Sequence, residues 1–88
     1  MSKTKNIEQT LAERKTTHGD FSVGACGSQM IKAAMRDSPN WDELPDYMKE
    51  SLEMIASKIS RILSGNYNHV DSWHDISGYA SLVEKMLE

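Results

Sequence analysis

The sequence has little of what secreted, membrane-spanning and nucleic-acid-binding proteins usually carry. Its single cysteine, Cys26, excludes a disulfide within the chain. No apolar run approaches the length of a membrane span, and residues 1–5 lack the apolar stretch of a signal peptide. Ten Lys and Arg against thirteen Asp and Glu give a net charge of −3, too small for a DNA mimic and of the wrong sign for a general nucleic-acid binder. We therefore expect a cytoplasmic protein without a membrane segment or a nucleic-acid partner.

The length of 88 residues predicts a single helical domain, residues 1–88. A domain of this size buries about 60–65% of the surface that its unfolded chain exposes, which gives only a modest core. Self-association would add buried surface to such a chain. We therefore expect a homo-oligomer, in which the helix faces that carry Met54, Gly78 and Leu82 are covered.

Apolar residues recur at three- and four-residue intervals, which predicts an all-α fold without strands. A first helix is expected from residue 3 to about residue 17, with His18 and Gly19 ending it. Either Asp20 or Ser22 can cap the N-terminus of a second helix. Short connections between successive helices favour antiparallel neighbours, so we expect a compact four-helix arrangement.

The middle of the chain contains two kinds of interruption. Gly24 and Gly27 weaken the start of the second helix, and close packing of another helix is their expected use. Residues 36–40 have the composition of a loop, and residues 41–45 indicate a helix entry with proline in the first turn. The loop therefore separates the second and third helices.

The third and fourth helices have the clearest apolar stripes. The third is expected to end at Ser64 and Gly65, with the glycine in a left-handed conformation. The fourth can begin at Asn68, Asp71 or Ser72. The two stripes are Met48, Leu52, Ile55, Ile59, Ile62 and Leu63, and then Trp73, Ile76, Tyr79, Ala80, Val83, Met86 and Leu87.

Two pairs of carboxylates lie one helical turn apart, Glu50 with Glu53 and Asp71 with Asp75. Each pair can project from one helix face. Mg²⁺ in proteins is held by a few carboxylates together with waters and substrate phosphates. The pairs therefore predict a Mg²⁺ site, and the alternative is an acidic face that lies in solvent or at a subunit interface.

Cationic and imidazole side chains provide candidates for substrate binding. Lys58 and Arg61 can bind phosphates, or they can form surface ion pairs with the neighbouring glutamates, worth about 0.2–0.5 kcal/mol each. His18 can act as a base or as a hydrogen-bond donor to phosphate, or it can satisfy the last carbonyls of the first helix. Arg14 and Asp20 can close the site or pair with each other to fix the turn.

Two sets of motifs resemble known families. Arg14-x-x-x-His18-Gly19-Asp20-Phe21 and Asp71-x-Trp73-x-Asp75-Ile76-x-Gly78-Tyr79 resemble a small family found mostly in phages and prophages, over nearly the whole chain. Glu50-x-x-Glu53, followed by an acidic pair that ends in Asp75, is similar to the E-x-x-E and E-x-x-D signature of the all-α NTP pyrophosphohydrolases, the MazG-like superfamily. This second resemblance covers residues from about 48 to 87.

The MazG-like resemblance implies a helical dimer or tetramer in which four acids hold Mg²⁺ while water attacks a nucleoside triphosphate, releasing pyrophosphate and a monophosphate. Glu50 and Glu53 match the first acidic pair, and Asp75 matches the final aspartate. Ser72 occupies the position of the expected glutamate, so Asp71 would substitute from one residue earlier. Glu53 is then the expected catalytic residue, because it can orient or deprotonate the water.

The sequence leaves more than one function class open. The first is a Mg²⁺-dependent nucleoside triphosphate pyrophosphohydrolase. The second is a non-catalytic phage protein that binds and modulates a host or defence protein. The third is a nucleotide-binding sponge without turnover, which the serine at position 72 favours.

Overall fold

A computed structural model describes residues 6–88 of the chain. The described part contains four α-helices and no strand, so the predicted all-α class is confirmed. The helices are α1 (Ile7–His18), α2 (Phe21–Arg36), α3 (Asp46–Ser64) and α4 (Val70–Leu87), with a short 3-10 helix, η1 (Trp41–Glu43), between α2 and α3. Residues 3–5 of the predicted first helix lie outside the described residues.

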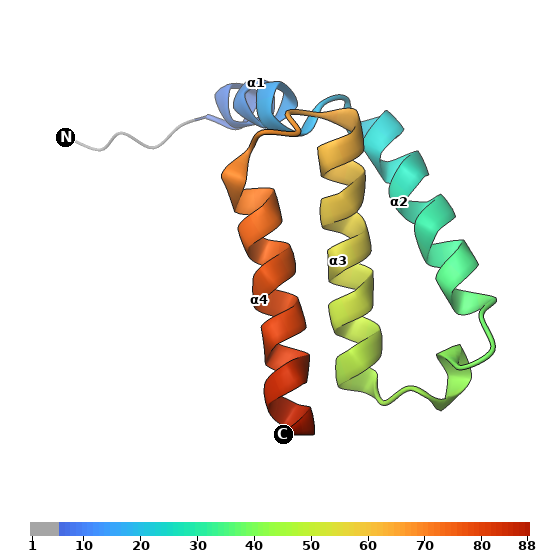
Figure 1. Ribbon diagram of the computed structural model, residues 1–88. Helices are drawn as coiled ribbons and strands as arrows, with labels where there is room; N and C mark the ends of the chain where they lie inside the picture. Colours follow the sequence, from blue (N-terminus) through green and yellow to red (C-terminus); the bar gives the residue numbers. More distant parts are fainter. Residues whose placement is uncertain (1–5) are drawn as a thin grey trace.

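The helices form an open layer rather than a closed bundle. α2, α3 and α4 lie side by side and antiparallel to their neighbours, with α3 in the middle, and α1 lies across the end of the layer (Figure 1). α1 lies across the end of the layer because its connection to α2 turns the chain sharply at Gly19 and Asp20. One side of the three-helix layer is therefore not covered by α1.

Gly19 ends α1 as predicted. It adopts φ +79°, and its N–H donates to the Lys15 carbonyl over 2.8 Å. Of the two predicted caps for α2, Asp20 is the one used, because its carboxylate accepts hydrogen bonds from the backbone N–H groups of Ser22 and Val23 at 2.9 and 3.2 Å. The α1–α2 turn is thus held by a hydrogen bond at the end of α1 and by two hydrogen bonds at the start of α2.

The α1–α2 turn packs directly on the α3–α4 turn. The Asn66 N–H donates to the Thr17 carbonyl at 2.8 Å. A Cβ atom on Gly19 would overlap the Ser64 carbonyl oxygen, and one on Gly65 would overlap the backbone of His18. Gly65 itself has φ −129°, so the predicted left-handed conformation is wrong. Glycine is needed at this position for close backbone approach rather than for a positive φ.

α2 and α3 approach closely through small residues. The Ser60 hydroxyl donates to the Gly24 carbonyl at 2.5 Å. A Cβ atom on Gly27 would lie 3.0 Å from the same hydroxyl oxygen, a separation that few real contacts adopt. The predicted use of the two glycines for close helix packing is confirmed.

Two helix starts differ from the prediction. Pro45 is the cap before α3 rather than a residue of its first turn. α4 begins at Val70 after His69, whereas Asn68, Asp71 or Ser72 was the predicted start. The turn before α4 is held instead by Asn66, whose side chain accepts the Asn68 N–H at 3.0 Å.

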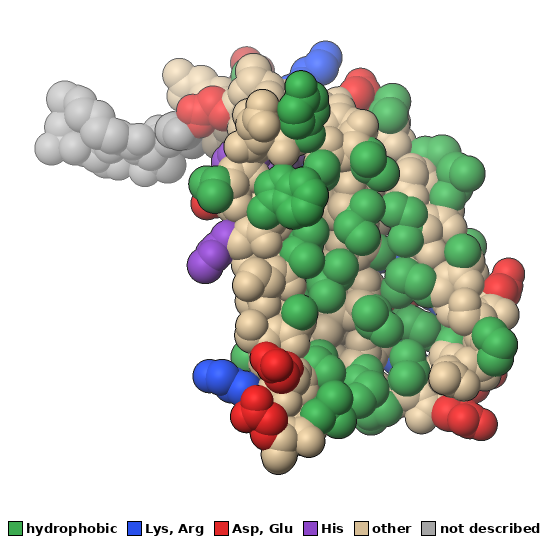
Figure 2. All heavy atoms as spheres, in the orientation of Figure 1, with side chains coloured by type: hydrophobic (Ala, Val, Ile, Leu, Met, Phe, Trp, Pro, Cys, Tyr) green, Lys and Arg blue, Asp and Glu red, His purple; other side chains and the backbone are tan. Residues whose placement is uncertain are grey.

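Very little apolar surface is fully buried. Ala56 is the only buried hydrophobic residue within residues 6–88, and it lies among buried serines from all three helices of the layer. The apolar stripes of α3 and α4 are only partly covered, and large side chains such as Leu63 and Trp73 remain 76% and 55% exposed. Hydrophobic side chains spread over much of the face of the layer shown in Figure 2.

Candidate functional site

A cavity of about 500 Å³ lies beneath α1, between α1, α2 and α3. This volume is within the range of about 300–1,000 Å³ that is typical of small-molecule sites. Its walls combine three kinds of side chain. They are the cationic Arg14, Lys15 and Arg61, the hydroxyl-bearing Ser28, Ser57 and Ser60, and the apolar Leu11, Phe21 and Ala25, with His18, Asp20, Gln29 and two glycines completing the lining.

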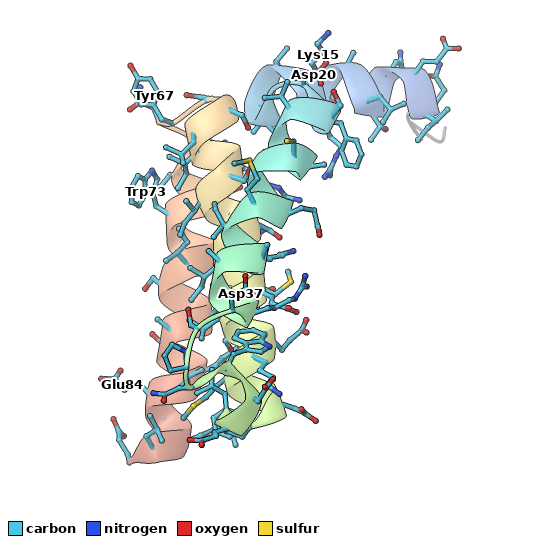
Figure 3. The ribbon with its side chains drawn as sticks, turned by 90° about the vertical axis from the view of Figure 1, so that its right-hand side faces the viewer. Lys15, Asp20, Asp37, Tyr67, Trp73 and Glu84 are labelled. Atoms are coloured by element: carbon cyan, nitrogen blue, oxygen red, sulfur yellow. The ribbon has the colours of Figure 1, made fainter. Side chains whose placement is uncertain are left out.

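The cavity has an excess of positive charge. Arg14 and Lys15 come from the last turns of α1, and Arg61 comes from the last turn of α3. Within residues 6–88, no carboxylate lies within 4.0 Å of either arginine. Asp20 is the only acid in the lining, and its carboxylate is engaged as the cap of α2 (Figure 3). Such a cavity attracts an anion.

His18 lies where the two turns meet. Its ring packs edge to face against the ring of His69, with the ring centroids 5.7 Å apart. Burial is the largest cause that lowers the pKa of His18 below its ordinary value, followed by the positive charges of Arg61 and Arg14. His18 is therefore neutral at pH 7. Its Nδ1 atom is buried and has no hydrogen-bond partner among the described residues.

The predicted acids of α3 have separate surroundings. Glu53 points toward α2, where its carboxylate accepts a hydrogen bond from Arg36 at 2.9 Å. Glu50 is exposed. Glu53 is thus engaged with α2, and Glu50 has no ion pair within 4.0 Å among residues 6–88.

The acids of α4 are likewise held by other partners. Asp75 pairs with Lys58 of α3 at 3.0 Å, and this hydrogen bond is the main cause of a lowered Asp75 pKa. Asp71 is exposed and lies 3.7 Å from His69. Within residues 6–88, no three His, Cys, Asp or Glu side chains are grouped so that they could hold a metal ion. Within the described part of one chain, the four acids predicted to hold Mg²⁺ are therefore not grouped as one set of ligands.

The residues predicted to bind substrate are mostly brought together. Arg14, His18, Asp20 and Arg61 all line the cavity, although they come from different helices. Lys58 is outside the lining, but its charge reaches His18 and contributes to the lowering of its pKa. For Asp20, the observed role is that of a helix cap, and no ion pair with Arg14 is present among the described residues.

Sequence reasoning missed several lining residues. Lys15 follows Arg14 directly and was available as a second cation, but α1 has too weak an apolar stripe to show which of its residues face the layer. Phe21 was noted as part of a motif but not as a site residue, and its side chain, 88% exposed, borders the cavity. The serines of the lining carry no sequence signal beyond their helical spacing.

Comparison of the chain with protein-family models, with curated proteins and with solved structures found no match. Within the described residues, none of the helices has the length and apolar character needed to cross a membrane.

Proposed function

We propose that this protein binds a nucleotide in the cavity beneath α1. The observation that carries the proposal is the convergence of Arg14 and Lys15 from α1 with Arg61 from α3 on one cavity. A guanidinium group can donate two parallel hydrogen bonds to the oxygens of a phosphate, which makes arginine well suited to phosphate recognition. The absence of a nearby carboxylate among the described residues leaves the charge of both arginines available.

The apolar part of the lining supports a nucleotide rather than a simple phosphate ion. Phe21 and Leu11 are 88% and 57% exposed, and both border the same cavity as the cations. An aromatic ring of this kind offers a surface on which a nucleobase can stack. The hydroxyl groups of Ser28 and Ser57 add hydrogen-bonding groups deeper between α2 and α3.

Neutral His18 contributes a hydrogen-bonding group without adding charge. In its neutral form the imidazole has one N–H donor and one acceptor nitrogen. The donor can bind a phosphate oxygen, while Arg14 and Arg61 supply the positive charge. In this proposal, the arginines supply positive charge, His18 supplies a directional hydrogen bond, and Phe21 supplies a stacking surface.

Mg²⁺-dependent hydrolysis stays a prediction from the acidic pairs and the MazG-like resemblance. Glu53 and Asp75 are occupied by Arg36 and Lys58, so we derive no metal-dependent step from this arrangement. The membership of a phage family and the binding of a host protein also stay predictions.

The proposal is tested by isothermal titration calorimetry with purine and pyrimidine nucleoside triphosphates, with and without Mg²⁺. Arg61→Ala is the main variant and Arg14→Ala the second. A hydrogen bond to a charged group contributes about 1.5–3 kcal/mol, so each variant is expected to weaken binding at least tenfold. Arg36→Ala is the matched control, because Arg36 is an arginine of the same layer outside the cavity.

Separate titrations with inorganic triphosphate and with adenosine show which cavity residues bind the phosphates and which bind the nucleoside. Phe21→Ala is expected to weaken the nucleotide and leave triphosphate unchanged. Failure of every nucleotide to bind at millimolar concentration would refute the proposal. An equal loss in Arg36→Ala would also refute it, because binding would then not depend on the cavity.

Turnover is a separate measurement. Pyrophosphate release from the same nucleotides with Mg²⁺, abolished in Glu53→Ala, would establish the predicted hydrolase. Binding without pyrophosphate release would assign the protein to the nucleotide-binding class without turnover.

A further inference from the structure

The uncovered side of the layer presents a continuous apolar surface, which we call the apolar face. Its exposed members lie four, seven or fourteen residues apart along their helices, and these spacings keep side chains near one side over several turns. Figure 2 shows hydrophobic side chains running across this side, and Figure 3 shows Trp73 projecting away from α1. The exposed members are Val23 and Met30 of α2, Leu52, Ile59 and Leu63 of α3, and Trp73 and Leu87 of α4.

These side chains are too exposed for the surface of a folded monomer. Met30 is 68% exposed, Leu63 76% and Trp73 55%. Stable folds are built from at least two packed layers, because one layer cannot bury its apolar side. Within residues 6–88, only Ala56 is a fully buried apolar residue. The second layer that would complete the core is therefore not supplied by the described part of the chain.

The accessible surface gives the size of the missing contact. The chain exposes 6592 Å², whereas a folded monomer of 9.9 kDa is expected to expose about 5,200 Å². Residues 1–5, counted as fully unfolded chain, would account for at most about 800 Å² of this excess of about 1,400 Å². The remaining excess, between roughly 600 and 1,400 Å², includes the value of about 800 Å² that each partner buries in a standard interface.

The charge distribution favours a second copy as the partner. Each chain carries a net charge of −3, so two copies repel each other unless they meet where charge is absent. The middle of the face in Figure 2 shows no charged side chain, and the acidic and basic groups lie at its edges. A two-fold axis through such a face brings identical apolar stripes together.

We propose that two copies of this chain pair through the apolar face, α2, α3 and α4 of one packing against the same helices of the other. The pairing makes a two-layer, six-helix core. The cavity lies on the opposite side of the layer, beneath α1, so both cavities of the dimer stay open to solvent. The pairing does not depend on nucleotide binding.

The test is the molar mass in solution, by light scattering coupled to size-exclusion chromatography, from about 1 to 100 μM, the micromolar range over which transient association is seen. The wild type is expected at twice the chain mass of 9.9 kDa. Leu63→Glu is expected to shift the mass to that of one chain. Leu82→Glu is the matched control, because Leu82 is also exposed, at 60%, but lies half a helical turn around α4 from Trp73.

A second measurement keeps the test decisive if Leu63→Glu does not fold. In a Trp41→Phe background, emission from Trp73 reports the apolar face. We expect a blue-shifted emission protected from acrylamide in the dimer, and a red shift on dilution. The melting temperature of the wild type is expected to rise by several degrees for each tenfold increase in concentration, because folding and pairing are linked.

Three results would overturn the proposal. The first is a folded wild-type chain that remains monomeric at 100 μM. The second is an assembly that survives Leu63→Glu but is lost in Leu82→Glu, because the contact would then use the cavity side. The third is a Trp73 emission that is solvent-exposed and independent of concentration.

Discussion

Gly19→Ala is expected to be the most damaging single-methyl substitution in the chain. Gly19 has φ +79° and ψ −166°, a backbone conformation that is essentially restricted to glycine. An added Cβ atom would also overlap the carbonyl oxygen of Ser64 on the α3–α4 turn. The substitution therefore strains the α1–α2 turn and separates it from the turn on which it packs.

The expected loss can be estimated from these two effects. A non-glycine residue in such a conformation costs about 1–3 kcal/mol. Relief of the overlap moves the two turns apart and breaks the hydrogen bond from Asn66 to Thr17, which adds about 0.5–1.5 kcal/mol. The total is about 1.5–4.5 kcal/mol. A chain of 88 residues typically has about 4–13 kcal/mol of unfolding free energy.

Gly78→Ala is the matched control. Gly78 lies within α4, and a Cβ atom there would meet nothing within 4 Å. The same methyl group is expected to stabilise the protein by about 0.5–1 kcal/mol, since alanine favours helix more than glycine does. The assay is urea denaturation followed by circular dichroism at one fixed protein concentration, which holds any self-association constant.

A Gly19→Ala variant whose unfolding free energy stays within about 0.5 kcal/mol of the wild type, the usual range of a neutral surface substitution, would refute this reasoning. Such a result would mean that the two turns do not touch. A destabilised Gly78→Ala would instead indicate that another molecule packs against this part of α4.

Three further predictions concern groups around the cavity and the layer. Ser60→Ala is expected to lower the unfolding free energy by about 1 kcal/mol, measured in urea, because it removes the hydrogen bond to the Gly24 carbonyl between α2 and α3. His18→Gln is expected to flatten the decline in stability below pH 6.5: the pKa of His18 is lowered in the folded protein, so the unfolded chain takes up its proton first as the pH falls. Melting curves at pH 7.5 and 5.5 check this. Asp75→Asn is expected to destabilise the protein at pH 7, because it removes the partner of Lys58, whose side chain is only 12% exposed. The pKa of Asp75 is lowered by folding, so the difference from wild type should shrink as the pH falls below 3.8 in a pH series of melting temperatures.

The existence of the helices could be predicted from the sequence because apolar spacing determines which residues share a helix face. The start of α4 could not, because it depends on contacts made within the turn. The Asn66 side chain and the hydrogen bond from the Trp73 indole to the Tyr67 carbonyl, 2.9 Å long, set where this helix begins. Spacing also cannot show what covers an apolar stripe, so the open layer was not predicted.

The candidate site could likewise be predicted only in part from the sequence. Arg14, His18, Asp20 and Arg61 were named as substrate-binding candidates from the sequence, and the packing of α1 against the layer brings them to one cavity. The carboxylate pairs have the predicted helical spacing, but spacing along a helix does not determine which neighbour each acid meets. Glu53 is directed to α2, whereas the acids of α4 are not.

α1 is attached to the molecule chiefly at one end, and none of its residues is fully buried. Local opening of this helix would break few contacts, so its amide hydrogens should exchange with solvent faster than those of α3. Because α1 also supplies Arg14 and Lys15 to the cavity, a bound anion would have to keep the helix closed. The order of α1, followed by hydrogen exchange, is thus a direct readout of whether the cavity is filled.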